Sequence, residues 1–191
     1  GLVSSKSSPS GASQPYELNI NFLDALASPA EKPDSFQIPR FLAAHACLFA
    51  LAGLPAIYVH SLLGSNGWLE GVRSSGHNRT INHQKFELPV LNRELDDHSS
   101  TRSRVFRSLA AMLSARRSRP AFHPNSAQCI LTLHPAVFSI LRTPQTGFPI
   151  LCLHNLSTTT APVPLKNALK GLQKGTWTDI LTGERFPLGD L

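Results

Sequence analysis

The stretch FLAAHACLFALAGLPAIYV, residues 41–59, is the most apolar part of the chain and decides the predicted fold. Pro39 suits the first turn of a helix, and residues 40–52 are apolar nearly all round, as in a helix packed into a larger body. Gly53 should end this helix. Residues 54–59, LPAIYV, then form a short apolar run that is typical of a parallel strand buried on both faces.

The residues before this stretch extend the same pattern. Residues 16–26, YELNINFLDAL, begin with strand-like alternation, so that strand, helix and strand follow one another as in a crossover unit of an α/β fold. Residues 1–15 are rich in Ser, Gly and Pro and should form an exposed loop. A transmembrane reading of residues 41–59 is disfavoured because His45, Gly53 and Pro55 interrupt the run.

The last third of the chain follows a different period. Ser99 or Ser100 can cap a second helix, which has an apolar stripe of Val105, Leu109, Met112 and Leu113. From Gln128 onward the period becomes two, as expected for an antiparallel sheet or sandwich. The predicted strands are 128–134, 136–143 and 148–157, with weaker candidates at 161–165 and 177–186.

Composition and charge narrow the classes of function. The chain has 191 residues, of which 41% are hydrophobic and 16% charged, with a net charge of +6. This composition is globular. Much of the positive excess lies in the second helix, but its arginines face away from the apolar stripe without interleaved aromatic residues, so a solvated face is favoured over a nucleic-acid interface. Three cysteines with apolar neighbours predict reduced thiols and a cytoplasmic protein without a membrane partner.

Few residues carry recognisable chemistry by themselves. His77 and His83 match no zinc-site spacing, and Ser61 after His60 lacks a nucleophile elbow. Glycoside chemistry needs a pair of carboxylates beside the scissile bond. Of the candidates, only Asp24 arguably follows a strand, so the chain is short of catalytic groups; the others are Glu70, Asp96 and Asp97.

The polar segment 60–85 is a stronger candidate for binding. It leaves the C-terminal end of the predicted parallel strand, where α/β folds and β/α barrels place their ligand-binding loops. It contains most of GHNRTINHQKF, residues 76–86, which is polar around a single isoleucine. Long ordered loops are usually functional, but composition and position leave a solvated loop equally open.

Several motifs together resemble one family. They are GLPAIYVHSLLGS at 53–65, GHNRTINHQKF at 76–86, RSRVFRSLAAMLSARRSRPAFHPNSAQCIL at 102–131 and WTDILTG at 177–183. Their order and spacing resemble the C-terminal part of sucrose-phosphorylase-like enzymes of the α-amylase superfamily, glycoside hydrolase family 13. The subfamily also holds glucosylglycerate phosphorylases, to which HSLLGS and NRTIN look slightly closer.

This resemblance implies an α/β region followed by an all-β region. Residues 1–120 would be the C-terminal part of a (β/α)8 TIM barrel, with 54–59 as its eighth strand and 60–85 on the rim of the active site. Residues 121–191 would be an antiparallel β-sandwich domain, truncated at its end. The catalytic carboxylates of the family lie on earlier strands, so we expect no catalytic residue in this chain, no cofactor, no metal ion and no activity of the fragment alone.

The resemblance also implies a reaction and a set of binding residues. A retaining phosphorylase forms a β-glucosyl-enzyme, which inorganic phosphate attacks to release α-glucose 1-phosphate. The partners would be a sugar substrate and phosphate, with glycerate, fructose or fructose 6-phosphate as the acceptor. Arg79 is the first candidate for phosphate or acceptor contact, because a guanidinium fork matches phosphate or carboxylate oxygens. Asn78, Asn82 and His60 complete the candidate set, whereas His83 stands where the family commonly has arginine.

Two other interpretations remain open. The chain could be a noncatalytic protein that binds carbohydrate or another partner through its β region. It could also be part of a hydrolase of the same superfamily.

Overall fold

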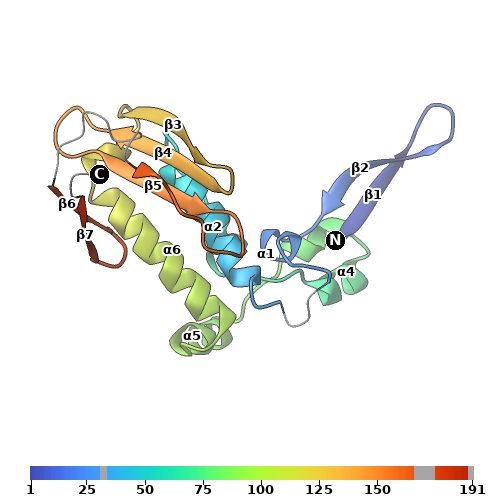
Figure 1. Cartoon of the computed structure of the whole chain (residues 1–191). Helices are drawn as coiled ribbons and strands as arrows, with labels where there is room; N and C mark the ends of the chain where they lie inside the picture. Colours follow the sequence, from blue (N-terminus) through green and yellow to red (C-terminus); the bar gives the residue numbers. More distant parts are fainter. Residues whose placement is uncertain (31–33, 166–174, 189–191) are drawn as a thin grey trace. The chain divides into compact units, whose positions relative to one another are not determined.

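The computed structural model describes residues 1–30, 34–165 and 175–188. These residues form two compact units, one made of residues 1–41 and 57–108 and the other of residues 42–56 and 109–191. Helices are mixed with three antiparallel sheets, which join β1 to β2, β3 through β4 to β5, and β6 to β7 (Figure 1).

A β-hairpin opens the first unit. β1, Leu2–Ser7, pairs with β2, Ser13–Asn19, with Val3 opposite Leu18 and a register shift after Ser4. The expected exposed loop over residues 1–15 is therefore wrong. Pairing uses main-chain groups, so the polar side chains indicated exposure correctly but did not exclude a ladder. Gly11 closes the turn at a φ of +82°, a conformation that favours glycine.

Short helices follow the hairpin in the first unit. They are α1, Phe22–Ala25, α3, Val59–Leu62, α4, Leu69–Ser75, the 3₁₀ helix η1, Asn78–Asn82, and α5, Leu88–Asp96. Segment 60–85 is therefore ordered around helical turns rather than a plain loop. The buried apolar side chains of this unit are Leu23, Phe41, Leu63, Ile81 and Val105. Gly64, at a φ of +55°, lies so close that an added Cβ would come 2.9 Å from Val105.

The predicted buried strand at 54–59 is not formed. Leu54 is 85% exposed, Tyr58 and Val59 are about half exposed, and Val59 already belongs to α3. A parallel strand requires neighbouring strands, and none of the described residues pairs with this run. The predicted crossover unit is also wrong, because β2 pairs with β1 alone. The helix between them is confirmed as α2, Gln37–Ala50, with Pro39 in its first turn.

The second long helix, α6, covers Thr101–Arg117. Its cap is Ser100, whose Oγ accepts a hydrogen bond from the backbone N–H of Ser103 at 3.0 Å. This geometry confirms one of the two predicted caps. The sequence prediction missed the separate helix α5 before it. A short 3₁₀ turn, η2, Pro120–Phe122, follows α6.

The period-two segments form strands as predicted. β3, Ala127–His134, β4, Val137–Thr143, and β5, Ile150–Asn155, make a meander in which Ile140 lies opposite both Ile130 and Cys152. β6, Gly175–Thr178, and β7, Arg185–Leu188, form a separate hairpin. Residues 161–164, by contrast, adopt no strand.

The sheet β3–β4–β5 lies over the C-terminal part of α2 within the second unit (Figure 1). Its central strand is the most buried, with Ile140 and Arg142 both at 0% exposure. Cys47, Cys129 and Cys152 are free thiols. None of the helices in the described ranges is long and apolar enough to span a bilayer.

Candidate functional site

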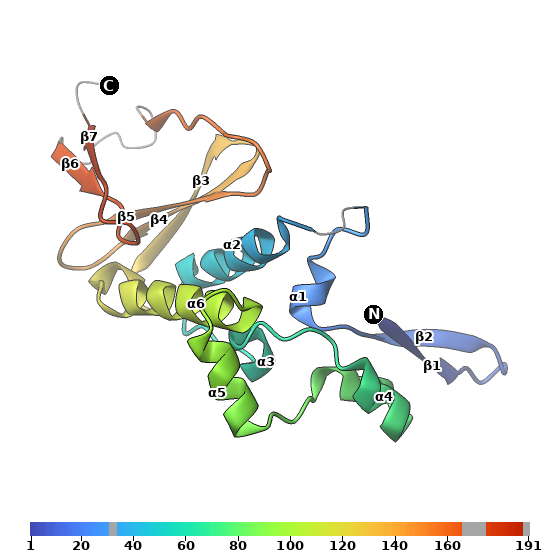
Figure 2. The same ribbon diagram turned by 90° about the horizontal axis from the view of Figure 1, so that it is seen from below.

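The candidate site is the part of the first unit where segment 60–86 meets the β1–β2 hairpin. Figure 2 shows α4 beside the base of this hairpin. Asp24, just after the hairpin, holds the segment in place at Asn66 and Gly67. Its two carboxylate oxygens accept hydrogen bonds from Asn66 Nδ2 and from the backbone N–H of Gly67, each at 2.6 Å. Asp24, the one carboxylate predicted to follow a strand, thus has a positioning contact.

Arg79 lies on η1 and faces solvent, with 71% of its side chain exposed. Its Nε donates to both carboxylate oxygens of Glu17 on β2, at 3.0 and 3.1 Å, and its Nη2 lies 2.9 Å from Glu17 Oε1. The hydrogen bond from Arg79 holds the pKa of Glu17 below its usual value. The guanidinium therefore already binds a carboxylate in the forked geometry that suits an oxyanion.

The two asparagines of η1 behave differently. Asn78 Nδ2 donates to the carbonyl of Val3 and to Ser4 Oγ, both at 3.2 Å, and so braces η1 against β1. Asn82 Oδ1 is buried and accepts no hydrogen bond from any described residue. The main-chain oxygen of Asn82 accepts the Tyr58 hydroxyl at 2.6 Å. Leaving a buried acceptor without a hydrogen-bond donor costs free energy of folding. Asn82 is the predicted site residue with such an acceptor.

His60 is 5% exposed and lies between aromatic rings. The ring centroids of Tyr58 and Phe86 are 5.2 and 5.1 Å from that of His60, and His60 Nδ1 lies 3.3 Å from Ser65 Oγ. Burial lowers the pKa of His60, and the nearby His83 and Arg102 lower it further. The imidazole is therefore mostly neutral at pH 7 and is suited to hydrogen bonding rather than to carrying charge.

Arg102 contacts the residues that surround His60. The sequence patterns do not single it out as a site residue. Its Nε donates to Glu94 Oε2 at 2.6 Å, its Nη1 to Ser65 Oγ at 2.9 Å, and its guanidinium lies 4.6 Å from the Phe86 ring centroid. Only 14% of this side chain is exposed. The prediction that the basic face of this helix is solvated is therefore wrong for Arg102. Sequence periodicity could not reveal the burial of Arg102, because its partners lie on other elements.

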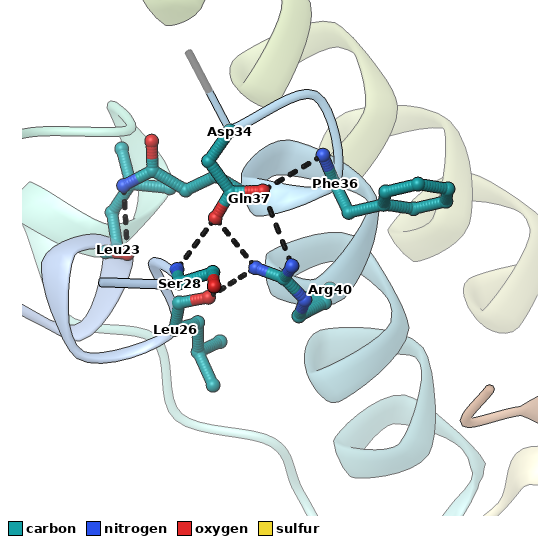
Figure 3. A network of polar contacts seen from close by, with 7 residues as sticks. All are labelled: Leu23, Leu26, Ser28, Asp34, Phe36, Gln37 and Arg40. Carbon is teal, nitrogen blue, oxygen red and sulfur yellow. Dashed lines mark hydrogen bonds and ion pairs between the residues drawn. The ribbon is translucent and has the colours of Figure 1, made fainter. Parts of the chain in front are cut away.

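A second polar network lies near the start of α2 (Figure 3). The Asp34 carboxylate accepts two hydrogen bonds from Arg40 and one each from the backbone N–H groups of Ser28 and Phe36. Arg40 also donates to the carbonyl of Leu26. The Arg40 bonds, followed by the Ser28 N–H, lower the pKa of Asp34 to about 2. These bonds tie the segment after α1 to α2, which is a structural role.

The remaining candidates show no catalytic arrangement. Glu70 and Asp96 are exposed, and Asp97 accepts hydrogen bonds from Ser99 in a local turn. Within the described ranges, no three His, Cys, Asp or Glu side chains gather closely enough to hold a metal ion. Of the predicted site residues, Arg79 has an exposed guanidinium paired with Glu17, Asn82 has a buried acceptor without a donor among the described residues, and His60 has a buried imidazole.

No protein-family model matches the chain. Three curated proteins called glucosylglycerate phosphorylase do. The protein of Spirochaeta thermophila is 46% identical over 159 residues, which are 82% of this chain and 27% of the relative. That of Escherichia coli is 37% identical over 183 residues, 96% of this chain and 32% of the relative. That of Allomeiothermus silvanus is 39% identical over 132 residues, 69% of this chain and 24% of the relative.

The chain thus spans about a quarter to a third of the length of these relatives. The resemblance inferred from its motifs is confirmed, because the matches fit a C-terminal portion of a phosphorylase-like protein.

Proposed function

We propose that the chain is the C-terminal portion of a retaining α-glucoside phosphorylase that transfers glucose from glucosylglycerate to phosphate and yields α-glucose 1-phosphate. The observation that carries this proposal is that three relatives named for that activity match most of the chain at 37–46% identity. In this proposal residues 1–120 are the C-terminal part of a (β/α)8 barrel, in which residues 54–59 become a strand only by pairing with strands outside these 191 residues, and residues 121–191 belong to an all-β domain. The catalytic carboxylates are supplied from outside these 191 residues.

In this proposal, Arg79 binds phosphate or the carboxylate of glycerate. Glu17 occupies the fork in the ligand-free state, and the incoming oxyanion replaces it. The exposure of Arg79 and its bidentate contact with Glu17 support this exchange, because the same geometry accepts either oxyanion. Glu17 thereby keeps the guanidinium oriented before the ligand arrives.

The other three residues complete the binding site. Asn82 Oδ1, which lacks a donor among the described residues, accepts a hydroxyl of the acceptor sugar or of glycerate. Asn78 keeps η1 in place through β1, and His60 supports the segment as a neutral imidazole. Each of these roles is one of binding or positioning, and none requires proton transfer.

A chimera tests the proposal directly. The segment of the Spirochaeta thermophila relative that this chain matches is replaced by the corresponding residues of this chain, and release of α-glucose 1-phosphate from glucosylglycerate and phosphate is measured. We expect phosphorolysis by the chimera and none by the 191-residue chain alone. A folded chimera that only hydrolyses glucosylglycerate, or turnover by the isolated chain, would contradict the proposal.

The role of Arg79 is tested in the same chimera. Arg79→Ala should raise the KM for phosphate or glycerate about tenfold or more, because a charge-assisted contact with the ligand is lost. Arg104→Ala is the matched control, because Arg104 is an exposed arginine on α6. Equal KM values for the two variants would remove Arg79 from the binding site.

A further inference from the structure

The second unit carries more positive than negative charge, and its acidic residues lie only at its C-terminal end. No Asp or Glu occurs between Asp97 and Asp179, although this stretch includes the arginines at the end of α6 and Arg142 on β4. Arg116 and Arg142 are both buried, and neither forms an ion pair with a described carboxylate. Unbalanced cations at a protein surface attract anions.

Arg116 and Arg142 use carbonyl groups instead of carboxylates. Arg116 donates to the carbonyls of Phe49, Leu51 and Gly53, and Arg142 donates to that of Ala50. These acceptors lie at the C-terminal end of α2, where the helix dipole is negative. The carbonyls accept hydrogen bonds from both arginines, although the buried Arg142 Nε has no partner among the described residues. Because carbonyls carry only partial charge, the positive charge of this region remains.

A pocket of about 540 Å³ opens beside these arginines, where α6 ends and η2 begins. Its lining combines basic residues, Arg116, Arg117, Arg119 and His123, with apolar residues that include Leu54 and Phe122. The pocket is formed by the second unit alone, so it is independent of Arg79 and the other candidate residues of the first unit.

Three of the polar groups at this pocket are free to bind. The guanidinium groups of Arg117 and Arg119 make no hydrogen bond or ion pair with the described part of the chain. His123 Nδ1 accepts the backbone N–H of Asn125 at 3.2 Å, so the proton of the neutral ring resides on Nε2, which can donate. The pocket therefore presents two unpaired cations and a further donor.

Arg117 also lies in the last turn of α6, where a cation stabilises the helix dipole. This effect does not extend to Arg119 or His123, which lie beyond the end of the helix. It also does not account for the apolar residues Leu54 and Phe122 in the lining of the same pocket. Stability of the helix and affinity for an anion can therefore be measured separately.

We propose that this pocket binds a phosphate monoester, with the phosphoryl group held by Arg117, Arg119 and His123 and the organic group packed against Leu54 and Phe122. Arginine forks match phosphate oxygens, and the apolar residues give the organic group a surface that inorganic phosphate cannot use. This site is distinct from the proposed phosphate or acceptor contact at Arg79 and does not depend on the phosphorylase assignment.

Calorimetric titration of the 191-residue chain tests the proposal, with phenyl phosphate, inorganic phosphate and phenol as probes at matched ionic strength. Phenyl phosphate should bind about tenfold more tightly than inorganic phosphate, and phenol should not bind. The double variant Arg117→Ala/Arg119→Ala should weaken phenyl phosphate binding at least tenfold. Circular dichroism checks that each variant keeps the helix content of the parent chain.

Two further variants distinguish binding in this pocket from a general effect of net charge and from binding at the first unit. Arg104→Ala/Arg107→Ala removes the same charge from an exposed face of α6 and should leave the affinity within about twofold. Arg79→Ala removes the phosphate contact proposed for the first unit, so phenyl phosphate binding that persists in this variant belongs to the second unit. Equal losses in the two double variants would reduce the effect to net charge, loss in Arg79→Ala would place binding on the first unit, and absence of phenyl phosphate binding would overturn the proposal.

Discussion

Arginines in the two units are used in opposite ways. Arg79 in the first unit is 71% exposed and forks onto the carboxylate of Glu17. Arg142 in the second unit is fully buried, donates to the backbone carbonyls of Ala50, His123 and Ser126, and has its guanidinium 5.9 Å from the Phe122 ring centroid. The exposed pair can exchange its carboxylate for a ligand, whereas the buried arginine cannot leave without stranding several acceptors.

Arg40 is intermediate between Arg79 and Arg142 in both its exposure and its type of partner. It pairs with the Asp34 carboxylate and the carbonyl of Leu26, and about a third of its side chain is exposed. The comparison shows that burial and partner type, rather than residue type, decide whether an arginine is a structural element or a binding group. The following changes test this order, beginning with the largest expected effect.

Replacing the buried arginine should have the largest effect on stability. Arg142→Met keeps much of the side-chain volume but removes the Arg142 hydrogen bonds to the carbonyls of Ala50, His123 and Ser126, of which the His123 carbonyl keeps the Ser126 N–H as a donor. We expect a loss of about 2–4 kcal/mol in the free energy of unfolding, measured by urea denaturation of the second unit. A variant as stable as the parent would mean that water satisfies these carbonyls and that the arginine is dispensable.

Arg116→Lys should have a smaller effect. Lysine keeps the charge but cannot reach the carbonyls of Phe49, Leu51 and Gly53 together, and it loses the guanidinium contact with Phe122. A loss of about 1–2 kcal/mol is expected by the same measurement. Arg117→Lys is the control, because the guanidinium of Arg117 has no hydrogen-bond partner among the described residues to lose and the change should be close to neutral. Equal losses for the two variants would contradict the role of the planar fork.

Asp34→Asn should change how stability depends on pH. The pKa of Asp34 is about 2 in the folded chain, mainly through Arg40, against an ordinary value of 3.8. The stability that this group contributes is therefore present above about pH 4 and is lost as the pH falls toward 2. Thermal unfolding between pH 5 and pH 2 should show a weaker dependence in Asp34→Asn. An unchanged profile would show that other carboxylates cause the acid sensitivity.

Arg79→Ala should affect stability least. Exposed ion pairs contribute little to folding, so the midpoint of thermal unfolding should change by no more than about 2 °C. The same substitution is expected to weaken ligand binding in the chimera, and this separation of stability from affinity distinguishes a binding arginine from a structural one. A large loss of stability in Arg79→Ala would place it with Arg142.

Much of the fold is predictable where the pattern is local. The alternation in residues 128–155 predicts β3, β4 and β5, and Ser100 is one of two predicted caps. Residues 54–59 fail as a strand because an apolar run specifies a strand only together with neighbours. Hairpin β1–β2 escapes prediction because main-chain pairing leaves little trace in polar side chains.

The candidate site is predictable only in part. The polar composition of residues 76–86 and the family resemblance point to Arg79, Asn78 and Asn82. The contacts of Arg102 with Ser65 and Phe86 join residues that are distant along the chain, and no spacing rule predicts them. The burial of Arg116 and Arg142 is hidden for the same reason, since their carbonyl partners carry no sequence signature.

The division into two units has a consequence for spectroscopy. The chain has two tryptophans, and Trp68 lies in the first unit whereas Trp177 lies in the second. Trp68 is held against the backbone of Gly71, where an added Cβ would come 2.1 Å from its ring. Replacing either tryptophan by phenylalanine therefore leaves a single tryptophan, and its selectively excited emission during denaturation reports on one unit without any added label.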